Sequence, residues 1–457
     1  MTITRHYVRV GDRMMHYRKA GSGPPLLMAH QSPRSSAEYV PLIERWSAHF
    51  TCIAPDTPGF GQSDPLPGAP EIGDFGDALI GFLDALGLDR VAAYGFHSGG
   101  IILMNALRRH PARFAALAIG GYAIWTPAEA ALLGDAYLPP FRPSAYGEHL
   151  TWLWNRVLEQ SWVFPWFDVR PEARLSLAHD DPVRVDSVVR EMLDAGDAYR
   201  AGYGAVLRAP RDIPPPDAET PPVLIAAYDG DPLQPHIDRL GPMPANWHAE
   251  KLRTPADLEA AALAHLRAAA LAACSPLADD PELGFLPVAA AGFDGLVHWR
   301  RLDDAPVLRL HAPGESLEFA AGSGIAIDLP GHGLSDGWTG PAPTDPEPWR
   351  DVVRAVAERL HTPVPPLPSR RVGEAVQLFP DLTPDRFGAY LTRAWGIVRA
   401  RHLFAPWYRA DAAHARPFDP AALAPERLAV EHRALLRAGA ARAYAIALEK
   451  EHDDGNS

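Results

Sequence analysis

The five residues at positions 95–99, Gly-Phe-His-Ser-Gly, place the imidazole of His97 between glycines at a spacing associated with catalysis. The pentapeptide has the frame G-x-S-x-G of a nucleophile elbow, with histidine where serine usually stands. An imidazole transfers protons near neutral pH, and it can also attack a carbonyl to form a labile acyl-imidazole. The motif therefore predicts a site for acid–base chemistry on a sharp turn.

The residues two positions before and two positions after the tip of an elbow must be very small, because the strand and the helix pack tightly there. Around His97 both positions are glycine, whereas around Ser98 one of them is Phe96. His97 is therefore expected at the tip, with a positive φ. Residues 91–94 are an apolar run suited to a buried parallel strand, and residues 100–107 begin an amphipathic helix.

The length and composition limit the class of protein. With 457 residues the chain exceeds what one core usually supports, so two domains are expected. A net charge of −13 argues against nucleic-acid partners, and no apolar run reaches membrane-spanning length. Two cysteines, Cys52 and Cys274, and the lack of a signal-peptide pattern predict a cytoplasmic protein.

The sequence of the first half of the chain predicts an α/β unit. Apolar runs predict strands at residues 24–28, 51–56, 91–94, 114–121 and 221–227. From about residue 125 to residue 211 the pattern becomes helical and aromatic, which predicts a cap over the site. The aromatic residues of this segment are Trp152, Trp154, Trp162, Trp166 and Phe167. They either form the core of the cap or line an apolar substrate pocket.

Three motifs together resemble the α/β-hydrolase superfamily over roughly residues 5–272: the elbow, His-Gln-Ser-Pro-Arg-Ser at residues 30–35, and the D-x-P-G-x-G-x-S-D turn at residues 56–64. The chain is more narrowly similar to bacterial sequences with HQ[ST]PRS at the oxyanion loop and G-x-H-[ST]-G at the elbow. The resemblance implies an eight-stranded type of sheet and an α/β-hydrolase domain over residues 1–275, with a cap at about residues 125–211.

The resemblance also implies the remaining catalytic residues. Asp231 follows the strand ending near residue 227 and precedes a proline, so it takes the place of the triad acid, with Asp229 in reserve. His248 lies seven residues before Pro255 and takes the place of the catalytic histidine. The chain order elbow, acid, histidine matches the superfamily. Catalysis is therefore expected from His97, Asp231 and His248.

The oxyanion loop is expected at residues 30–35, where His30 and Gln31 precede Ser32, and Gln31 replaces the usual glycine. The N–H of Ser32 would act with the N–H of Ser98 to hold a developing oxyanion. Arg34 predicts an anionic group on the substrate, such as a carboxylate. The alternative for Arg34 is a surface residue of the helix beside the loop.

Residues 276–457 look like a degenerate copy of the first half. Residues 328–336 repeat the spacing of the turn at residues 56–64. Prolines between residues 362 and 368 exclude a central strand where the elbow strand of the copy would stand. The copy is expected to keep early strands and a second helical cap. It either packs as one half of a pseudo-dimer within a monomer or is a structural remnant.

Three functions remain open. The first is hydrolysis of an ester, thioester or C–C bond of a small apolar-to-carboxylated molecule. The second is a non-hydrolytic lyase or a cofactor-free proton-transfer or oxygenation enzyme that stabilises an enolate-like charge. The third is a ligand-binding protein without catalysis. The sequence shows no metal-ligand spacing, phosphate-binding loop or dinucleotide fingerprint, so neither metal nor cofactor is expected.

Overall fold

The computed structural model describes residues 2–134, 136–275, 277, 279–368 and 372–454. The chain divides into two compact units. Unit 1 comprises Met1–Arg142 and Asn155–Asp279, and unit 2 comprises Pro143–Trp154 and Asp280–Ser457. The predicted domain boundary falls at residue 276, which lies outside the described residues. Residues 143–154, predicted as part of the first cap, group with unit 2.

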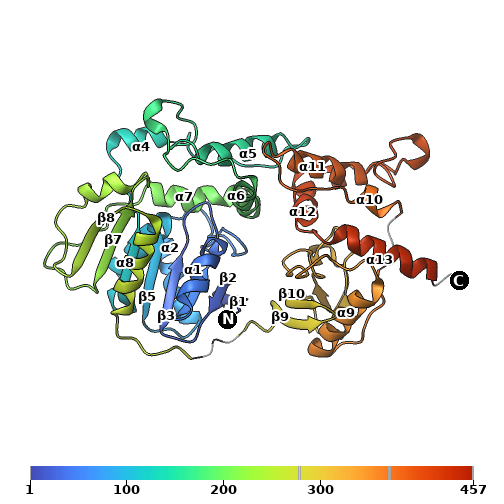
Figure 1. Ribbon diagram of the computed structural model, residues 1–457, viewed down its shortest axis with the longest axis horizontal. Coiled ribbons are helices and arrows are strands. Elements are labelled where there is room, and N and C mark those ends of the chain that lie inside the picture. The colour runs from blue at the N-terminus through green and yellow to red at the C-terminus, as the bar shows by residue number, and fades with distance from the viewer. Residues whose placement is uncertain (1, 135, 276, 278, 369–371, 455–457) are drawn as a thin grey trace. The chain divides into compact units, whose positions relative to one another are not determined.

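Unit 1 is built on an eight-stranded sheet in the order β1-β2-β4-β3-β5-β6-β7-β8 (Figure 1). The strands are β1 (Thr4–Val10), β2 (Arg13–Ala20), β3 (Pro25–Ala29), β4 (Thr51–Pro55), β5 (Val91–Phe96), β6 (Phe114–Gly120), β7 (Val223–Tyr228) and β8 (Trp247–Leu252). β2 is antiparallel to β1 and to β4, and the remaining pairs are parallel. The predicted eight-stranded α/β sheet is confirmed.

Helices cover both faces of this sheet. The helices from the start of the chain to residue 267 are α1 (Val40–Trp46), α2 (Ile72–Ala85), α3 (Ser98–Arg109), α4 (Pro127–Leu133), α5 (Glu148–Gln160), α6 (Pro182–Ala195), α7 (Tyr199–Leu207) and α8 (Pro255–Arg267), and residues 148–154 of α5 group with unit 2. α2, α3 and α7 contribute to the core on one face, and α1 and α8 to the core on the other. Because both faces are covered, β3, β4 and β6 are buried along their whole length, which explains their continuous apolar sequences.

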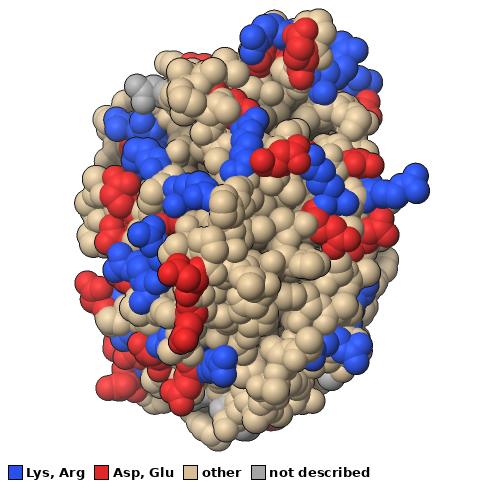
Figure 2. All heavy atoms as spheres, turned by 90° about the vertical axis from the view of Figure 1, so that its left-hand side faces the viewer, with Lys and Arg blue, Asp and Glu red and all other residues tan. Residues whose placement is uncertain are grey.

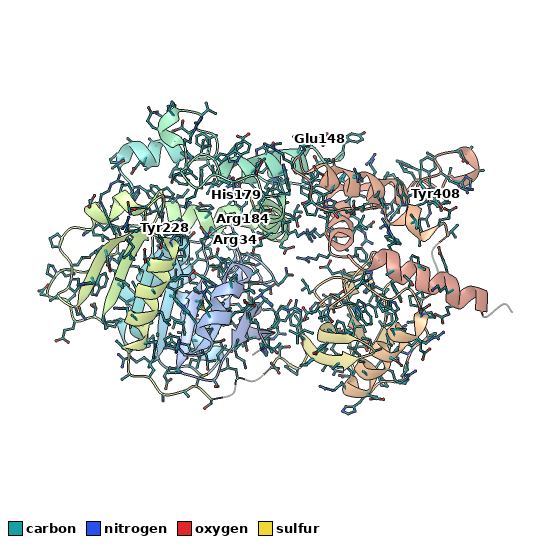
Figure 3. All side chains as sticks on the ribbon, in the orientation of Figure 1. Arg34, Glu148, His179, Arg184, Tyr228 and Tyr408 are labelled. Carbon is teal, nitrogen blue, oxygen red and sulfur yellow. The ribbon has the colours of Figure 1, made fainter. Side chains whose placement is uncertain are left out.

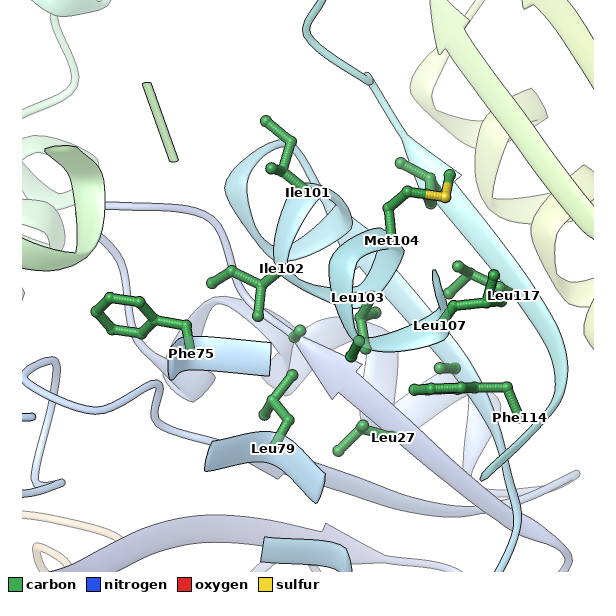
Figure 4. Close-up of a cluster of buried hydrophobic side chains, with 14 of the residues drawn as sticks. Leu27, Phe75, Leu79, Ile101, Ile102, Leu103, Met104, Leu107, Phe114 and Leu117 are labelled. Atoms are coloured by element: carbon green, nitrogen blue, oxygen red, sulfur yellow. The ribbon is translucent and has the colours of Figure 1, made fainter. Parts of the chain in front are cut away.

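The core beneath the elbow is a close-packed cluster of large apolar side chains (Figure 4). Leu103 and Leu107 of α3 are fully buried, as are Leu27 of β3 and Phe114 of β6. Phe75 and Leu79 of α2 complete the layer (Figure 4). This packing fixes α3 against the sheet, so the first residue of α3 is held rigidly at the carboxyl edge of β5.

Unit 2 has a smaller sheet in the order β11-β12-β10-β9. Its strands are β9 (Leu283–Ala290), β10 (Phe293–Arg301), β11 (Leu308–Arg309) and β12 (Ile325–Ile327). Its helices are α9 (Pro346–Leu360), α10 (Ala375–Leu378), α11 (Ala389–Arg401), α12 (Pro425–Leu436) and α13 (Ala441–Asp454). In the described part of unit 2 no strand follows β12, as the prolines after residue 361 lead one to expect.

One hydrogen-bond network recurs in the two units. In unit 1 the buried carboxylate of Asp56 accepts a bond from His16 Nδ1 at 2.8 Å and bonds from two backbone N–H groups. In unit 2 Asp328 accepts a bond from His298 Nδ1 at 2.8 Å and likewise from two N–H groups. The recurrence supports the predicted partial repeat, which stays a prediction.

Two tryptophans make matching contacts inside unit 2. Trp154 Nε1 donates to the carbonyl of Arg386 at 3.0 Å, and Trp395 Nε1 donates to the carbonyl of Ala145 at 3.3 Å. Trp395 and Arg386 follow Trp154 and Ala145 by the same sequence offset. Reciprocal contacts of this kind are typical of two-fold symmetric interfaces.

The surface at the side of unit 1 that carries β7 and β8 mixes both signs of charge. Figure 2 shows Lys and Arg interspersed with Asp and Glu on this face, with uncharged residues between them. No helix among the described residues has both the length and the apolarity needed to span a bilayer.

We predict that Asp56→Ala lowers the free energy of unfolding by about 3 kcal/mol or more, because three buried donors lose their acceptor. Burial raises the pKa of Asp56, but His16, together with Arg18 and His30, outweighs this and holds the pKa well below its ordinary value. The native carboxylate is therefore stabilising above its ordinary pKa, and this stabilisation fades on acidification. Urea unfolding at neutral pH measures the loss. The exposed Asp12→Ala variant is the control and should change stability by less than about 0.5 kcal/mol.

Candidate active site

The turn between β5 and α3 places His97 at the carboxyl edge of the sheet, with φ 47° and ψ −112°. Such a positive φ is uncommon for a residue with a side chain. A Cβ on Gly99 would lie 1.9 Å from the carbonyl oxygen of Ala29, and a Cβ on Gly95 would lie 2.6 Å from the nitrogen of Gly100. Both glycines are thus required by the close approach of β3, β5 and α3.

The imidazole of His97 contacts Asp231 directly. Nε2 lies 3.1 Å from each carboxylate oxygen, and the Asp231 side chain is fully buried beyond the end of β7. The N–H of Leu233 donates to Oδ1 of Asp231 at 2.8 Å. Burial opposes ionisation of Asp231, but His97 and the Leu233 N–H outweigh it and hold the pKa of this carboxyl below its usual value. An ionised Asp231 therefore fixes the proton of His97 on Nε2.

The ring of His97 is clamped in this orientation. It stacks on Phe96 with centroids 4.1 Å apart and planes 15° apart. A Cβ on Gly121, at φ +66°, would lie 2.5 Å from Cδ2 and 2.8 Å from Nε2 of His97. Gly121 therefore leaves room for the contact with Asp231, a role that spacing in the sequence does not reveal. No group in the described ranges hydrogen-bonds Nδ1 of His97, and the residue lines the neighbouring cavity.

The oxyanion loop differs from the prediction in one hydrogen bond. The N–H of Ser32 donates to Oγ of Ser98 at 2.7 Å, so the two N–H groups do not stand free beside each other. Since Oγ of Ser98 accepts this bond, its own proton is available to a further acceptor. Ser98 is the first residue of α3, where backbone N–H groups lack intrahelical partners.

His30 holds the loop in place instead of facing the substrate. Its Nε2 accepts the N–H of Thr57 at 2.8 Å, and its Nδ1 donates to the carbonyl of Gln31 at 2.9 Å. Burial lowers the pKa of His30, in keeping with this neutral, doubly bonded ring. Of the residues expected in the oxyanion loop, His30 is therefore corrected to a supporting residue that does not line the cavity, whereas Gln31 does line it.

Arg34 lies at the cavity wall but its charge is already compensated. It forms an ion pair with Glu191, and Glu38 lies 4.0 Å away. Its Nη2 also donates to Oγ of Ser187 at 3.2 Å. With two carboxylates beside it, Arg34 binds α6 to the oxyanion loop, and the prediction of a free anion-binding arginine at this position is corrected.

His248 is not brought to the site. It is exposed near the start of β8, where it pairs in register with Leu224 of β7. Asp231 follows the other end of β7, and the four residue steps from Leu224 to Tyr228 alone span roughly 13 Å. The proposed triad role of His248 is thus wrong, since His248 lies at the end of the sheet opposite to the edge that carries His97 and Asp231. Asp229, the reserve acid, is exposed and bonds to Gln234 Nε2.

A cavity of about 440 Å³ opens beside His97. Its wall is formed by the oxyanion loop, the elbow and the cap. Figure 3 labels Arg34 of the loop near Arg184 and His179 of the cap. The aromatic residues of the wall are Trp125, Tyr137, Phe164 and Tyr203. The five aromatic residues singled out in the sequence are not among the lining residues, so they serve the packing of the cap or of unit 2.

The alpha/beta hydrolase fold family has a model that matches residues 24–247. This part of the chain belongs to the alpha/beta hydrolase family. Haloalkane dehalogenase 2 of Mycobacterium tuberculosis is 34% identical over 112 residues, which cover 24% of this chain and 39% of that protein. The chain thus spans well under half the length of that relative.

Two further likenesses cover more of the hydrolase unit. The haloalkane dehalogenase of Mesorhizobium japonicum is 28% identical over 240 residues, covering 49% of this chain and 70% of that protein. The crystal structure of epoxide hydrolase A from Mycobacterium thermoresistibile is 19% identical, covers 59% of this chain and 100% of that one, and has a TM-score of 0.45.

The hydrolase unit also brings His236 and Arg156 near the site, and sequence reasoning missed both. His236 is buried, its Nδ1 accepts the N–H of Ile124 at 2.8 Å, and burial together with Arg239 lowers its pKa to about 4. Arg156 is 2% exposed and lines the cavity. Neither belongs to a motif, so only the fold could reveal them. Within the described residues no cluster of three or more metal-ligating side chains occurs.

We predict that Glu38→Gln stabilises the protein at pH 8 more than at pH 5. Burial raises the pKa of Glu38 to about 7, although Arg34 and Gln31 partly oppose this. The folded state therefore holds a proton that the unfolded state has lost, and stability falls as pH rises from the ordinary pKa of 4.5 towards 7. Tm measured from pH 4 to 8 tests this. The exposed Glu44→Gln variant is the control, and equal Tm profiles for wild type and Glu38→Gln would contradict the prediction.

Proposed function

We propose that the protein is a hydrolase in which His97, held by Asp231, acts as a general base. The observation that carries the proposal is the direct contact between Nε2 of His97 and the buried Asp231 carboxylate at 3.1 Å. Such a carboxylate fixes the tautomer of an imidazole and stabilises the imidazolium formed when the ring takes a proton. Because Nε2 is bonded to Asp231 and His97 lines the cavity, Nδ1 is the proton acceptor in this proposal.

In the proposed reaction, water attacks the carbonyl carbon of an ester or thioester while Nδ1 of His97 takes one proton from it. The resulting tetrahedral intermediate carries its charge on the former carbonyl oxygen. The proton then passes from Nδ1 to the leaving oxygen or sulfur as its bond to carbon breaks. The products are a carboxylic acid and an alcohol or thiol, and no acyl-enzyme forms.

The oxyanion is held by the Ser98 hydroxyl in this proposal. Oγ of Ser98 already accepts the N–H of Ser32 at 2.7 Å, which directs the hydroxyl proton elsewhere. The amino end of α3 adds a partial positive charge at the same place. These donors favour the intermediate over the uncharged substrate carbonyl.

The cavity supports a small substrate with an apolar body. About 440 Å³ of space lies between the elbow and the cap, with Ile101, Trp125 and Phe164 on its wall. Similarity to proteins named haloalkane dehalogenase supports hydrolysis as the reaction type.

We also propose that unit 2 is a partial repeat of the hydrolase unit and that the chain is a pseudo-dimeric monomer. The matching networks of Asp56 and Asp328 and the reciprocal contacts of Trp154 and Trp395 support this. The free thiols of Cys52 and Cys274 support a cytoplasmic location.

We predict that His97→Ala and Asp231→Asn each lower kcat/KM by about 10²- to 10⁴-fold on a panel of small esters and thioesters. The first variant removes the base, and the second removes the acceptor that orients it. Ser98→Ala should lower kcat by up to about 10²-fold, because only one oxyanion donor is lost.

The control is His248→Ala, which removes an exposed histidine at the far end of β8 and should leave kcat/KM unchanged. A fluorophosphonate probe distinguishes the mechanisms, since it labels an activated serine and should not label this protein. Covalent labelling of Ser98, with turnover surviving in His97→Ala, would show that serine is the nucleophile. Turnover that releases no acid or alcohol would instead indicate the lyase or proton-transfer alternative.

A further inference from the structure

One buried cation in the cavity wall has no anionic partner among the described residues. Arg156 of α5 is 2% exposed, and no described residue accepts a hydrogen bond from its Nε or Nη2. Its guanidinium lies 5.9 Å from the ring centres of both Tyr137 and Trp166. Aromatic faces stabilise a cation weakly compared with an ion pair, so the buried charge of Arg156 remains largely uncompensated.

The other cations around the cavity do not share this property. Arg34 is paired with Glu191 and lies near Glu38, and Arg184 is exposed to solvent. A charge that is both buried and unpaired is unfavourable unless a ligand completes it. Arg156 therefore has the strongest electrostatic reason in the cavity wall to bind an anion.

Polar side chains line the cavity together with Arg156. The hydroxyl groups of Tyr137 and Tyr203 lie 2.8 Å apart, and Tyr137 also donates to Oε1 of Gln160 at 3.4 Å. All three residues line the cavity together with Arg156 and His97. A ligand could thus place an anionic group at Arg156 while its apolar body extends along the wall towards the elbow.

The architecture of the helix does not itself require an arginine here. If α11 is aligned with α5 on Trp395 and Trp154, the position of Arg156 is taken by Ile397, which is buried and apolar. An aliphatic side chain thus suffices for packing in the second helix. The arginine of α5 calls for a reason other than packing.

We propose that Arg156 binds the carboxylate of a small apolar monocarboxylic substrate, in bidentate fashion through the planar guanidinium. The proposal deepens the proposed function, because it names a group that the substrate carries. It rests on that function only for the statement that the ligand is a substrate, since its test measures binding and not turnover.

The test compares hexanoate with its neutral analogue hexanamide by calorimetry and by thermal shift, on the full chain. We expect wild type to bind hexanoate at least about tenfold more tightly than hexanamide, and hexanoate to raise Tm. The His97→Ala variant should bind hexanoate as wild type does. If binding persists but no ester is turned over, the proposed function fails and the carboxylate site stands.

Variants of Arg156 provide the second part of the test. Arg156→Met keeps a long apolar stem, so it should retain or raise Tm while weakening hexanoate binding at least about tenfold and leaving hexanamide binding unchanged. Arg156→Lys should retain part of the preference for the carboxylate. The matched control is Arg184→Met at the exposed rim, which should change hexanoate affinity by less than about threefold.

Two results would overturn the proposal. One is equal binding of hexanoate and hexanamide by wild type, which decides the question even if Arg156→Met does not fold. The other is loss of hexanoate binding in Arg184→Met with full binding in Arg156→Met, which would move the anion site to the rim.

Discussion

The contact between His97 and Asp231 is the constraint on which the candidate site depends. It exists only because three glycines let backbone and ring approach closely: Gly95 and Gly99 at the turn, and Gly121 against the imidazole itself. With the elbow residue bonded to the acid, there is no gap between them for a third residue to bridge. The exposed position of His248 is consistent with this, since the site has no place for a second imidazole between His97 and Asp231.

The charged side chains around the cavity differ in whether a partner of opposite charge is buried beside them. Glu38 and Glu191 share Arg34, and burial raises the pKa of both carboxyl groups. This cluster is close to self-neutralising, so it can fasten the oxyanion loop to α6 without attracting a ligand. Arg156 has no such partners among the described residues, and this difference separates a structural arginine from one suited to binding.

Local spacing in the sequence was sufficient for the turn, because glycine on both sides of His97 is demanded by contacts within a few residues of it. It was also sufficient for the sheet, whose buried strands carry unbroken apolar runs. Spacing gave the wrong role for His248. A position seven residues before a proline fixes a distance along the chain, but it does not fix at which end of the strand the residue lies. Spacing also failed for Arg34 and Arg156 because the presence or absence of a carboxylate from α6 depends on packing between distant segments.

If unit 2 is the partial repeat that we propose, it indicates which parts of such a domain can be kept without catalysis. The carboxylate networks of Asp56 and Asp328 join early strands to the following turn in both units, so they satisfy buried donors and serve folding. The elbow is different, because a positive φ at a residue with a side chain costs free energy and gains nothing for packing. A copy relieved of catalysis would be expected to lose the strained turn first and the carboxylate network last. The described residues of unit 2 keep the network around Asp328 and contain no strand after β12 that could support an elbow. Under that proposal, the strained turn kept at His97 in unit 1 supports a working role for that imidazole.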